Sequence, residues 1–249
     1  YTISEKIAQG EVLWERTGGN NDPNFIHNQI MDEIELDRNE VLFESLKDST
    51  ISLVNGSLYS ISIIGTDLAG NTSRSEVVKN IFYDSIKPTL IVDEIADNDF
   101  INKIGFDYIL SENVMTGTII WESIKNDSTL INVLSSNELN KGNVKILEFN
   151  DKINLLNGES YNIKIFVVDS ANNQSDTLFL ENITYDVEEP VIVFNEPIEN
   201  SNIKSSNISY SLSETMSNVN LEWYRVGGSR DIKSPHITEL INNELLIGS

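Results

Sequence analysis

The sequence predicts an all-β protein of tandem antiparallel β-sandwiches, with about 102 residues per repeat. Three observations predict this fold: a long internal repeat, apolar residues at alternate positions, and many short segments bounded by Asn, Gly, Asp and Ser. No amphipathic helix of useful length is visible, although a parallel α/β fold would need several. The 249 residues, 39% of them apolar, suffice for about two domains of ordinary size with hydrophobic cores.

The repeat is the strongest signal in the chain. A shift of 102 positions aligns two sets of residues: Asn55-Gly56, Tyr59, Ile61, Asp67, Asn71, Tyr83-Asp84 and Pro88 with Asn157-Gly158, Tyr161, Ile163, Asp169, Asn173, Tyr185-Asp186 and Pro190. A second block, Tyr-x-(Ile/Leu)-Ser-Glu followed nine residues later by Trp, occurs three times, ending at Trp14, Trp121 and Trp223. The repeats predict domains at 1–84, 85–186 and 187–249. We expect the first to lack its opening strand or strands and the third to stop before its last strands.

The middle repeat predicts seven short strands with a period of two. They are expected near 88–94, 103–110, 117–123, 137–140, 144–149, 160–168 and 177–185. Seven strands in about a hundred residues are typical of an immunoglobulin-like sandwich.

Two aromatic positions favour the same sandwich type. Tyr59 and Tyr161 each follow an Asn-Gly pair by three residues, as in a tyrosine corner, where the phenol bonds back to the upstream backbone. Trp121 falls on the third expected strand, where its ring would span the gap between two sheets. We therefore predict that Trp121 is buried and packs with Leu110, Ile163 and Ile165.

These residues resemble the immunoglobulin-like repeats of very long bacterial cell-surface and secreted proteins. The resemblance rests on Tyr-x-Leu-Ser-Glu, on Trp-x-Arg-x-Gly-Gly at Trp14 to Gly19, on Ser-Pro-His at Ser234 to His236 and on Asp-x-Ala-Gly-Asn at Asp67 to Asn71. It implies an extracellular or cell-surface stalk, adhesin or spacer without catalytic residues. The middle repeat departs from the pattern, because it lacks the Gly-Gly pair and the His and has Asn172 where the first has Gly70.

The net charge of −22 limits the classes of partner. Such a surface repels phosphate backbones and anionic headgroups, so we expect no nucleic-acid partner. No window approaches 18 consecutive apolar residues, so we expect no membrane insertion in this segment. The chain has no cysteine, which excludes disulfides and thiolate chemistry, and a zinc site would have to rest on its two histidines and on carboxylates.

Catalytic constellations are not evident. His27 and His236 each lie thirteen residues after a Trp, and no nucleophile recurs beside them, so we predict that they anchor loops. Adjacent acids such as Glu188-Glu189 lack the cleft that glycoside hydrolysis needs, and the segment from Asp97 to Tyr108 fails the EF-hand pattern.

Four aspartates near the joints between repeats indicate a candidate calcium site at each joint. Each complete joint is expected to combine an Asp of the loop after the sixth strand, Asp67 or Asp169, with the Asp before the linker, Asp84 or Asp186. Residues of the next repeat would add oxygens: Glu112, Asn113 and Glu214. The alternative is that Asp-x-Ala-Gly-Asn is a tight turn whose Asp caps backbone amides, with a positive φ at Gly70 or Asn71. No other cofactor is required.

Three functions remain open. The first, which we favour, is a non-enzymatic spacer or adhesin stalk whose partners are the neighbouring repeats of the same chain. The second is a binding module for a cell-surface, glycan or protein ligand. The third is an accessory region of a secreted hydrolase.

Overall fold

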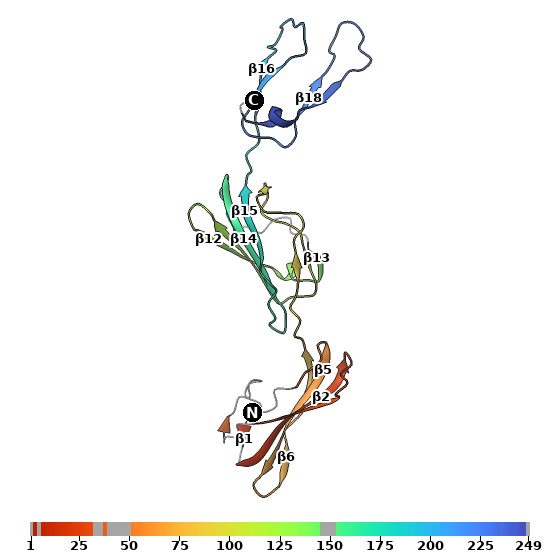
Figure 1. Cartoon of the computed structure of the whole chain (residues 1–249), viewed down its shortest axis with the longest axis vertical. Helices are drawn as coiled ribbons and strands as arrows, with labels where there is room; N and C mark the ends of the chain where they lie inside the picture. The colour runs from red at the N-terminus through yellow and green to blue at the C-terminus, as the bar shows by residue number, and fades with distance from the viewer. Residues whose placement is uncertain (1, 4–5, 32–36, 39–50, 145–152, 248–249) are drawn as a thin grey trace. The chain divides into compact units, whose positions relative to one another are not determined.

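The computed structural model describes residues 2–3, 6–31, 37–38, 51–144 and 153–247 (Figure 1). Within these residues there is no α-helix, and strands are joined by turns and two short 3₁₀ helices, η2 (Ser136–Glu138) and η3 (Asn242–Leu245). The predicted all-β class is confirmed. The chain divides into two compact units, Tyr1–Tyr185 and Asp186–Ser249.

The first part of unit 1 is an antiparallel sheet built around two long strands. The sheet runs in the order β3-β2-β5-β6, and β7 also pairs with β5. Its strands are β2 (Ile7–Gly19), β3 (Ile26–Ile30), β5 (Ser57–Asp67), β6 (Thr72–Arg74) and β7 (Val78–Tyr83). A separate short pair joins β1 (Thr2–Ile3) to β4 (Asp37–Arg38).

The second part of unit 1 has two sheets. The five-stranded sheet has the order β12-β11-β14-β15-β9, comprising β9 (Phe100–Ile101), β11 (Thr116–Ser123), β12 (Thr129–Val133), β14 (Glu159–Val168) and β15 (Leu178–Tyr185). The three-stranded sheet has the order β13-β10-β8, comprising β8 (Leu90–Ile91), β10 (Tyr108–Leu110) and β13 (Gly142–Val144). All pairings are antiparallel except that of β9 with β15.

The core of this part lies between the two sheets. Burial alternates strictly along β14, because successive side chains of a strand point to opposite faces. The three-stranded sheet contributes Tyr108, Leu110 and Val144 to a single cluster with Ile163 and Ile165 of β14. Trp121 is fully buried in this cluster with Leu110, Ile163 and Ile165, as predicted. Its ring also lies near those of Phe106 and Tyr161.

Unit 2 consists of two hairpins. β16 (Ile192–Glu196) pairs with β17 (Ser209–Leu212), and β18 (Asn220–Trp223) pairs with β19 (His236–Glu239).

Most expected strands of the middle repeat are present, with shifted bounds. The segment 137–140 was wrongly predicted as a strand, because η2 occupies Ser136–Glu138. There the Glu138 carboxylate accepts the Ser135 N–H at 2.5 Å, and the Glu138 N–H donates to the Ser135 carbonyl, so Ser-x-x-Glu caps a helical turn. The strand expected at 144–149 lies mostly outside the described residues. β9 and β12 were not predicted.

Candidate functional site

Both tyrosine corners and both Asp-initiated turns are present. The hydroxyls of Tyr59 and Tyr161 each accept a backbone N–H at 2.9 Å, from Val54 and Leu156. The Asp67 carboxylate accepts the backbone N–H groups of Ala69 and Asn71, which lie two and four residues later. The Asn71 side-chain amide also donates to this carboxylate. That bond contributes most to lowering the pKa of Asp67, and the backbone bonds lower it further. The turn interpretation of Asp67 to Asn71 is therefore confirmed, with the positive φ at Gly70.

Asp169 makes the equivalent turn after β14. Its Oδ1 accepts the N–H groups of Ala171 and Asn173 at 2.8 Å, and its Oδ2 accepts the Asn173 side-chain amide at 2.8 Å. Asn172 takes the positive φ that Gly70 takes in the other turn. The Asn173 amide also donates to the backbone carbonyl of Asp84 at 3.1 Å, which fixes the segment after β7 beside this turn.

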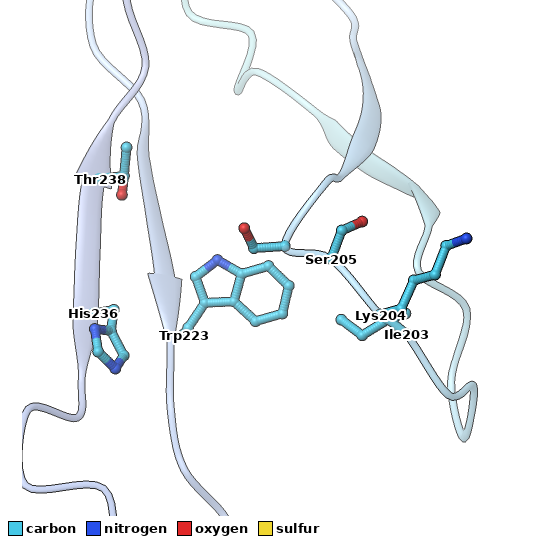
Figure 2. Close-up of a pocket in the computed structure, with 7 residues that line it drawn as sticks. Ile203, Lys204, Ser205, Trp223, His236 and Thr238 are labelled. Atoms are coloured by element: carbon cyan, nitrogen blue, oxygen red, sulfur yellow. The ribbon is translucent and has the colours of Figure 1, made fainter.

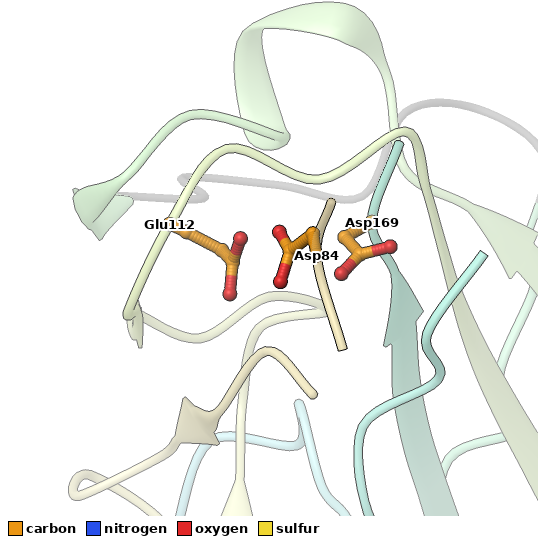
Figure 3. Close-up of side chains that lie close together, drawn as sticks. All are labelled: Asp84, Glu112 and Asp169. Carbon is orange, nitrogen blue, oxygen red and sulfur yellow. The ribbon is translucent and has the colours of Figure 1, made fainter. Parts of the chain in front are cut away.

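Three carboxylates converge at this point. Asp84 follows β7, Glu112 follows β10 and Asp169 follows β14, and their ligand oxygens all lie within 4.8 Å of one another (Figure 3). Asp169 is 1% exposed, whereas the other two are half-buried. A second hydrogen bond ties the segment after β7 to the turn before β5, where the Ser85 N–H donates to Asn55 Oδ1 at 2.8 Å.

The electrostatics of the cluster favour a positive charge. Burial raises the pKa of Glu112, and the negative charges of Asp84 and Asp169 raise it further, while Lys141 acts in the opposite direction. Carboxylate oxygens are the ligands that Ca²⁺ prefers, and three of them supply part of its usual six to eight. The donor type and charge fit a hard cation, with remaining positions left to water or backbone oxygens.

The structure brings together only some of the predicted ligands. Asp84 and Asp169 meet with Glu112, whereas Asp67 and Asp186 belong to no such group among the residues the structure describes. The Asp186 carboxylate instead accepts the N–H of Glu188 at 3.0 Å. Asn113 accepts the N–H of Lys141 at 2.7 Å. Asp169, in the turn of the middle repeat, therefore meets Asp84, which directly precedes that repeat. The sequence pattern had predicted the turn Asp of the preceding repeat, Asp67, at this joint.

A second cluster, which sequence reasoning missed, surrounds Asp22. Asp22 Oδ2 accepts the Tyr59 hydroxyl at 2.5 Å and lies 2.6 Å from His27 Nε2. The side chains of Asp22 and His27 are 1% and 6% exposed. Burial opposes ionisation of Asp22, but hydrogen bonds from Tyr59 and His27 outweigh it and lower its pKa. The cluster fastens the loop after β2 to β5, which agrees with the loop-anchoring role predicted for His27.

The same pair recurs at the β18–β19 hairpin, where His236 Nε2 lies 2.7 Å from Asp231 Oδ2. The signal that would have revealed it is positional. Asp22 and Asp231 both lie eight residues after Trp and five before His, in the shared pattern Trp-x-Arg-x-Gly-Gly-x-x-Asp-x-x-x-x-His.

No family model matches this chain, and no curated protein does. Within the described residues, no helix has the length and apolar character needed to cross a membrane.

Proposed function

We propose that this chain is a run of immunoglobulin-like repeats that serves as a non-enzymatic spacer or stalk in a large bacterial extracellular surface protein. One observation carries the proposal: the same strand pairing recurs at the spacing of the sequence repeat. Trp14 on β2 pairs with Ile61 on β5, and Trp121 on β11 pairs with Ile163 on β14. A module that repeats along a chain provides length rather than a single site.

The strand order supports the immunoglobulin-like part of the proposal. In the second part of unit 1, β10 lies between β8 and β13, while β14 lies between β11 and β15. Immunoglobulin domains have this arrangement, with strand B between A and E, and strand F between C and G. The corner tyrosines and the buried Trp121 on the third strand of the pattern add further support.

Calcium at the carboxylate cluster is the second part of the proposal. Asp84 precedes the second repeat, while Glu112 and Asp169 belong to it, so a cation held by all three would tie the segment between repeats to the repeat that follows. Neutralising three clustered carboxylates would also remove repulsion that favours opening of this segment.

Small-angle X-ray scattering tests the spacer function. A compact chain of this length has a radius of gyration of about 18 Å, whereas an array of modules in series is longer. We expect a value clearly above 18 Å that does not fall when calcium is added. A value near 18 Å would contradict a spacer.

One observation favours a ligand-binding module as a second candidate. Ile131, Ile120, Lys164 and Phe179 form a cross-strand row on the face of the five-stranded sheet that points away from the core. Ile131 and Phe179 are each 59% exposed. Glycan-array binding that is lost in Phe179→Ala would favour this candidate, whereas equal binding by that variant would count against this face.

A further inference from the structure

The outer face of the three-stranded sheet in the middle repeat is apolar at its centre. Ile109 of β10 pairs with Ile91 of β8 on one side and with Asn143 of β13 on the other. Ile109 points away from the core, because its neighbours Tyr108 and Leu110 are buried. Ile91 and Ile109 are 49% and 39% exposed, so two adjacent large apolar side chains meet water on this face.

A pocket of about 260 Å³ lies over this row, and Asp93, Glu94 and Asp107 line it together with the two isoleucines. Among the described residues that line the pocket, none is a Lys or an Arg. Its volume is below the range of about 300–1,000 Å³ that is usual for small-molecule sites, so it suits a single side chain better than a cofactor. The pocket combines an apolar floor with a negatively charged rim.

The fold holds the three acids at this pocket. Asp93 lies two residues after Ile91. Asp107 lies two residues before Ile109, which agrees with the place of both acids on the side of the sheet that carries the isoleucines. The Asp107 N–H also donates to Glu94 Oε2 over a long 3.4 Å. Like charges on neighbouring strands destabilise a sheet, and a cation bound among them would remove that cost.

The strand pairing of the sandwich does not require these side chains. In the middle repeat Ile91 lies opposite Ile109. At the positions 102 residues later, Val193 of β16 lies opposite Ser211 of β17. The residues 102 positions after Asp93, Glu94 and Asp107 are Asn195, Glu196 and Ser209. Two of the acids and one isoleucine are thus replaced where the strands pair alike, so the pocket chemistry belongs to the middle repeat alone of these two.

A cavity of unit 2 differs from this pocket in charge. It has a volume of about 600 Å³ and lies beside Trp223 and His236 (Figure 2). Its described lining includes Lys204 and neither an Asp nor a Glu. The high acid content of the chain therefore does not by itself place carboxylates around every hollow of the surface.

We infer that the pocket over Ile91 and Ile109 is a docking site for an arginine side chain on a basic segment of a partner protein. The methylene stem of the arginine packs on the two isoleucines, while its guanidinium group reaches the carboxylates of the rim. Guanidinium binds carboxylates through pairs of parallel hydrogen bonds, which the ammonium group of lysine does not form. The net charge of −22 attracts such a segment and speeds its association. The inference goes beyond the spacer function, because it assigns a partner chemistry to one repeat.

The test titrates the isotope-labelled full chain with the synthetic peptide acetyl-Gly-Ser-Arg-Ser-Gly-amide and follows the backbone amides by NMR. We expect the resonances of Ile91, Asp93, Asp107 and Ile109 to shift, and those of Asp169 and its turn to stay in place. The same peptide with citrulline, which has nearly the shape of arginine without its charge, should bind about tenfold more weakly. The peptide with lysine should also bind more weakly than the arginine peptide.

Two variants copy residues of unit 2 at matching positions, so they are compatible with the strand pairing. Asp107→Ser should weaken binding of the arginine peptide about fivefold, as for an ion pair that water still reaches. Ile109→Ser should cause a loss of similar size, about fivefold, because it removes part of the apolar floor. The matched control is Asp176→Asn, since that carboxylate is 93% exposed and lies outside the pocket; its affinity should equal that of the unchanged chain.

Four results would overturn the inference. The first is the absence of shifts at the pocket residues, and the second is equal affinity of the arginine peptide and either the citrulline or the lysine peptide. The third is an equal loss of affinity in Asp107→Ser and Asp176→Asn, because the attraction would then come from the net charge alone. The fourth is a shift of the same resonances by Mg²⁺, because a hydrated ion makes no use of the apolar floor.

Discussion

At the residue scale, Trp121 organises the core of the middle repeat. Its ring lies between the two sheets, within 6.4 Å of Phe106 and 6.2 Å of Tyr161, measured between ring centroids. Its place among alternating apolar residues predicted this burial, whereas Trp14 and Trp223, at the matching positions of the pattern, are only partly buried.

Truncation of this ring should be costly. We expect Trp121→Ala to lower the free energy of unfolding by about 3–5 kcal/mol, because the cavity left between two paired sheets collapses poorly. Urea denaturation measures the change. The control Val133→Ala, at a position 66% exposed in the same sheet, should stay within about 0.5 kcal/mol. Equal effects of the two substitutions would contradict the placement of Trp121 in the core.

Asp22 predicts an acid-sensitive step in stability. Its pKa is lowered in the folded state, so its contribution to stability is present above the unfolded pKa of about 3.9 and is lost as pH falls through the lower folded pKa. We expect Asp22→Asn to destabilise the chain at pH 7, because the buried Tyr59 and His27 lose their ionised partner.

The same substitution should flatten the loss of stability below about pH 4. Urea midpoints measured from pH 3 to pH 7 test both statements. Asp231→Asn is the matched control: it has the same His contact but is 40% exposed, so its effect should be smaller. If Asp22→Asn loses stability between about pH 4 and pH 3 as steeply as the unchanged chain, Asp22 is not the group responsible for that loss.

At the element scale, the repeat predicted the strands that carry the Trp and the Tyr, because both lie in long alternating segments. It missed β9, of two residues, because its pairing with β15 is a long-range parallel contact that leaves no local pattern. It missed η2 because Ser-x-x-Glu was not weighed as a capping signal.

The candidate site was only partly predictable for a related reason. Composition indicated which residue types gather at a joint, but only the fold shows that Asp169 turns back toward Asp84. Asp22 was missed because its recurrence as Asp231, in the pattern that the two Trp-to-His segments share, was not weighed. Its meaning depends on Tyr59, 37 positions away.

The joint predicts a calcium effect that depends on Glu112. Calcium should raise the melting temperature of the full chain relative to chelator, and Glu112→Gln should abolish most of that increment. In chelator, the same substitution should be neutral or stabilising, because it removes a charge that Asp84 and Asp169 repel. Differential scanning calorimetry measures both effects.

The raised pKa of Glu112 adds a test of sign. Stability in chelator should fall as pH rises from about 4.3 through the raised pKa, and Glu112→Gln should remove that fall. The control is Glu181→Gln, at an exposed position outside the cluster. If calcium still raises the melting temperature of Glu112→Gln by the same amount, the carboxylate cluster is not the calcium site. Asp169 is then a turn residue and Asp84 a linker residue, without a role in metal binding.

At the scale of the whole molecule, the account rests on modularity. The net charge of −22 repels like surfaces, which favours separation of neighbouring modules over collapse. The repeated pairing of Trp14 with Ile61 and of Trp121 with Ile163 indicates that each repeat has its own set of strands. A spacer of this kind should bear load one module at a time.

Stretching the full chain by its two ends in a single-molecule force experiment tests this claim most directly. The account predicts a separate unfolding event for the middle repeat, residues 85–186, that releases its 102 residues, or roughly 350 Å of extended chain at about 3.4 Å per residue. Trp121→Ala should lower the force of that event and leave the others unchanged. Release of residues 1–185 in one event, with no step of about 100 residues, would contradict independent modules in series.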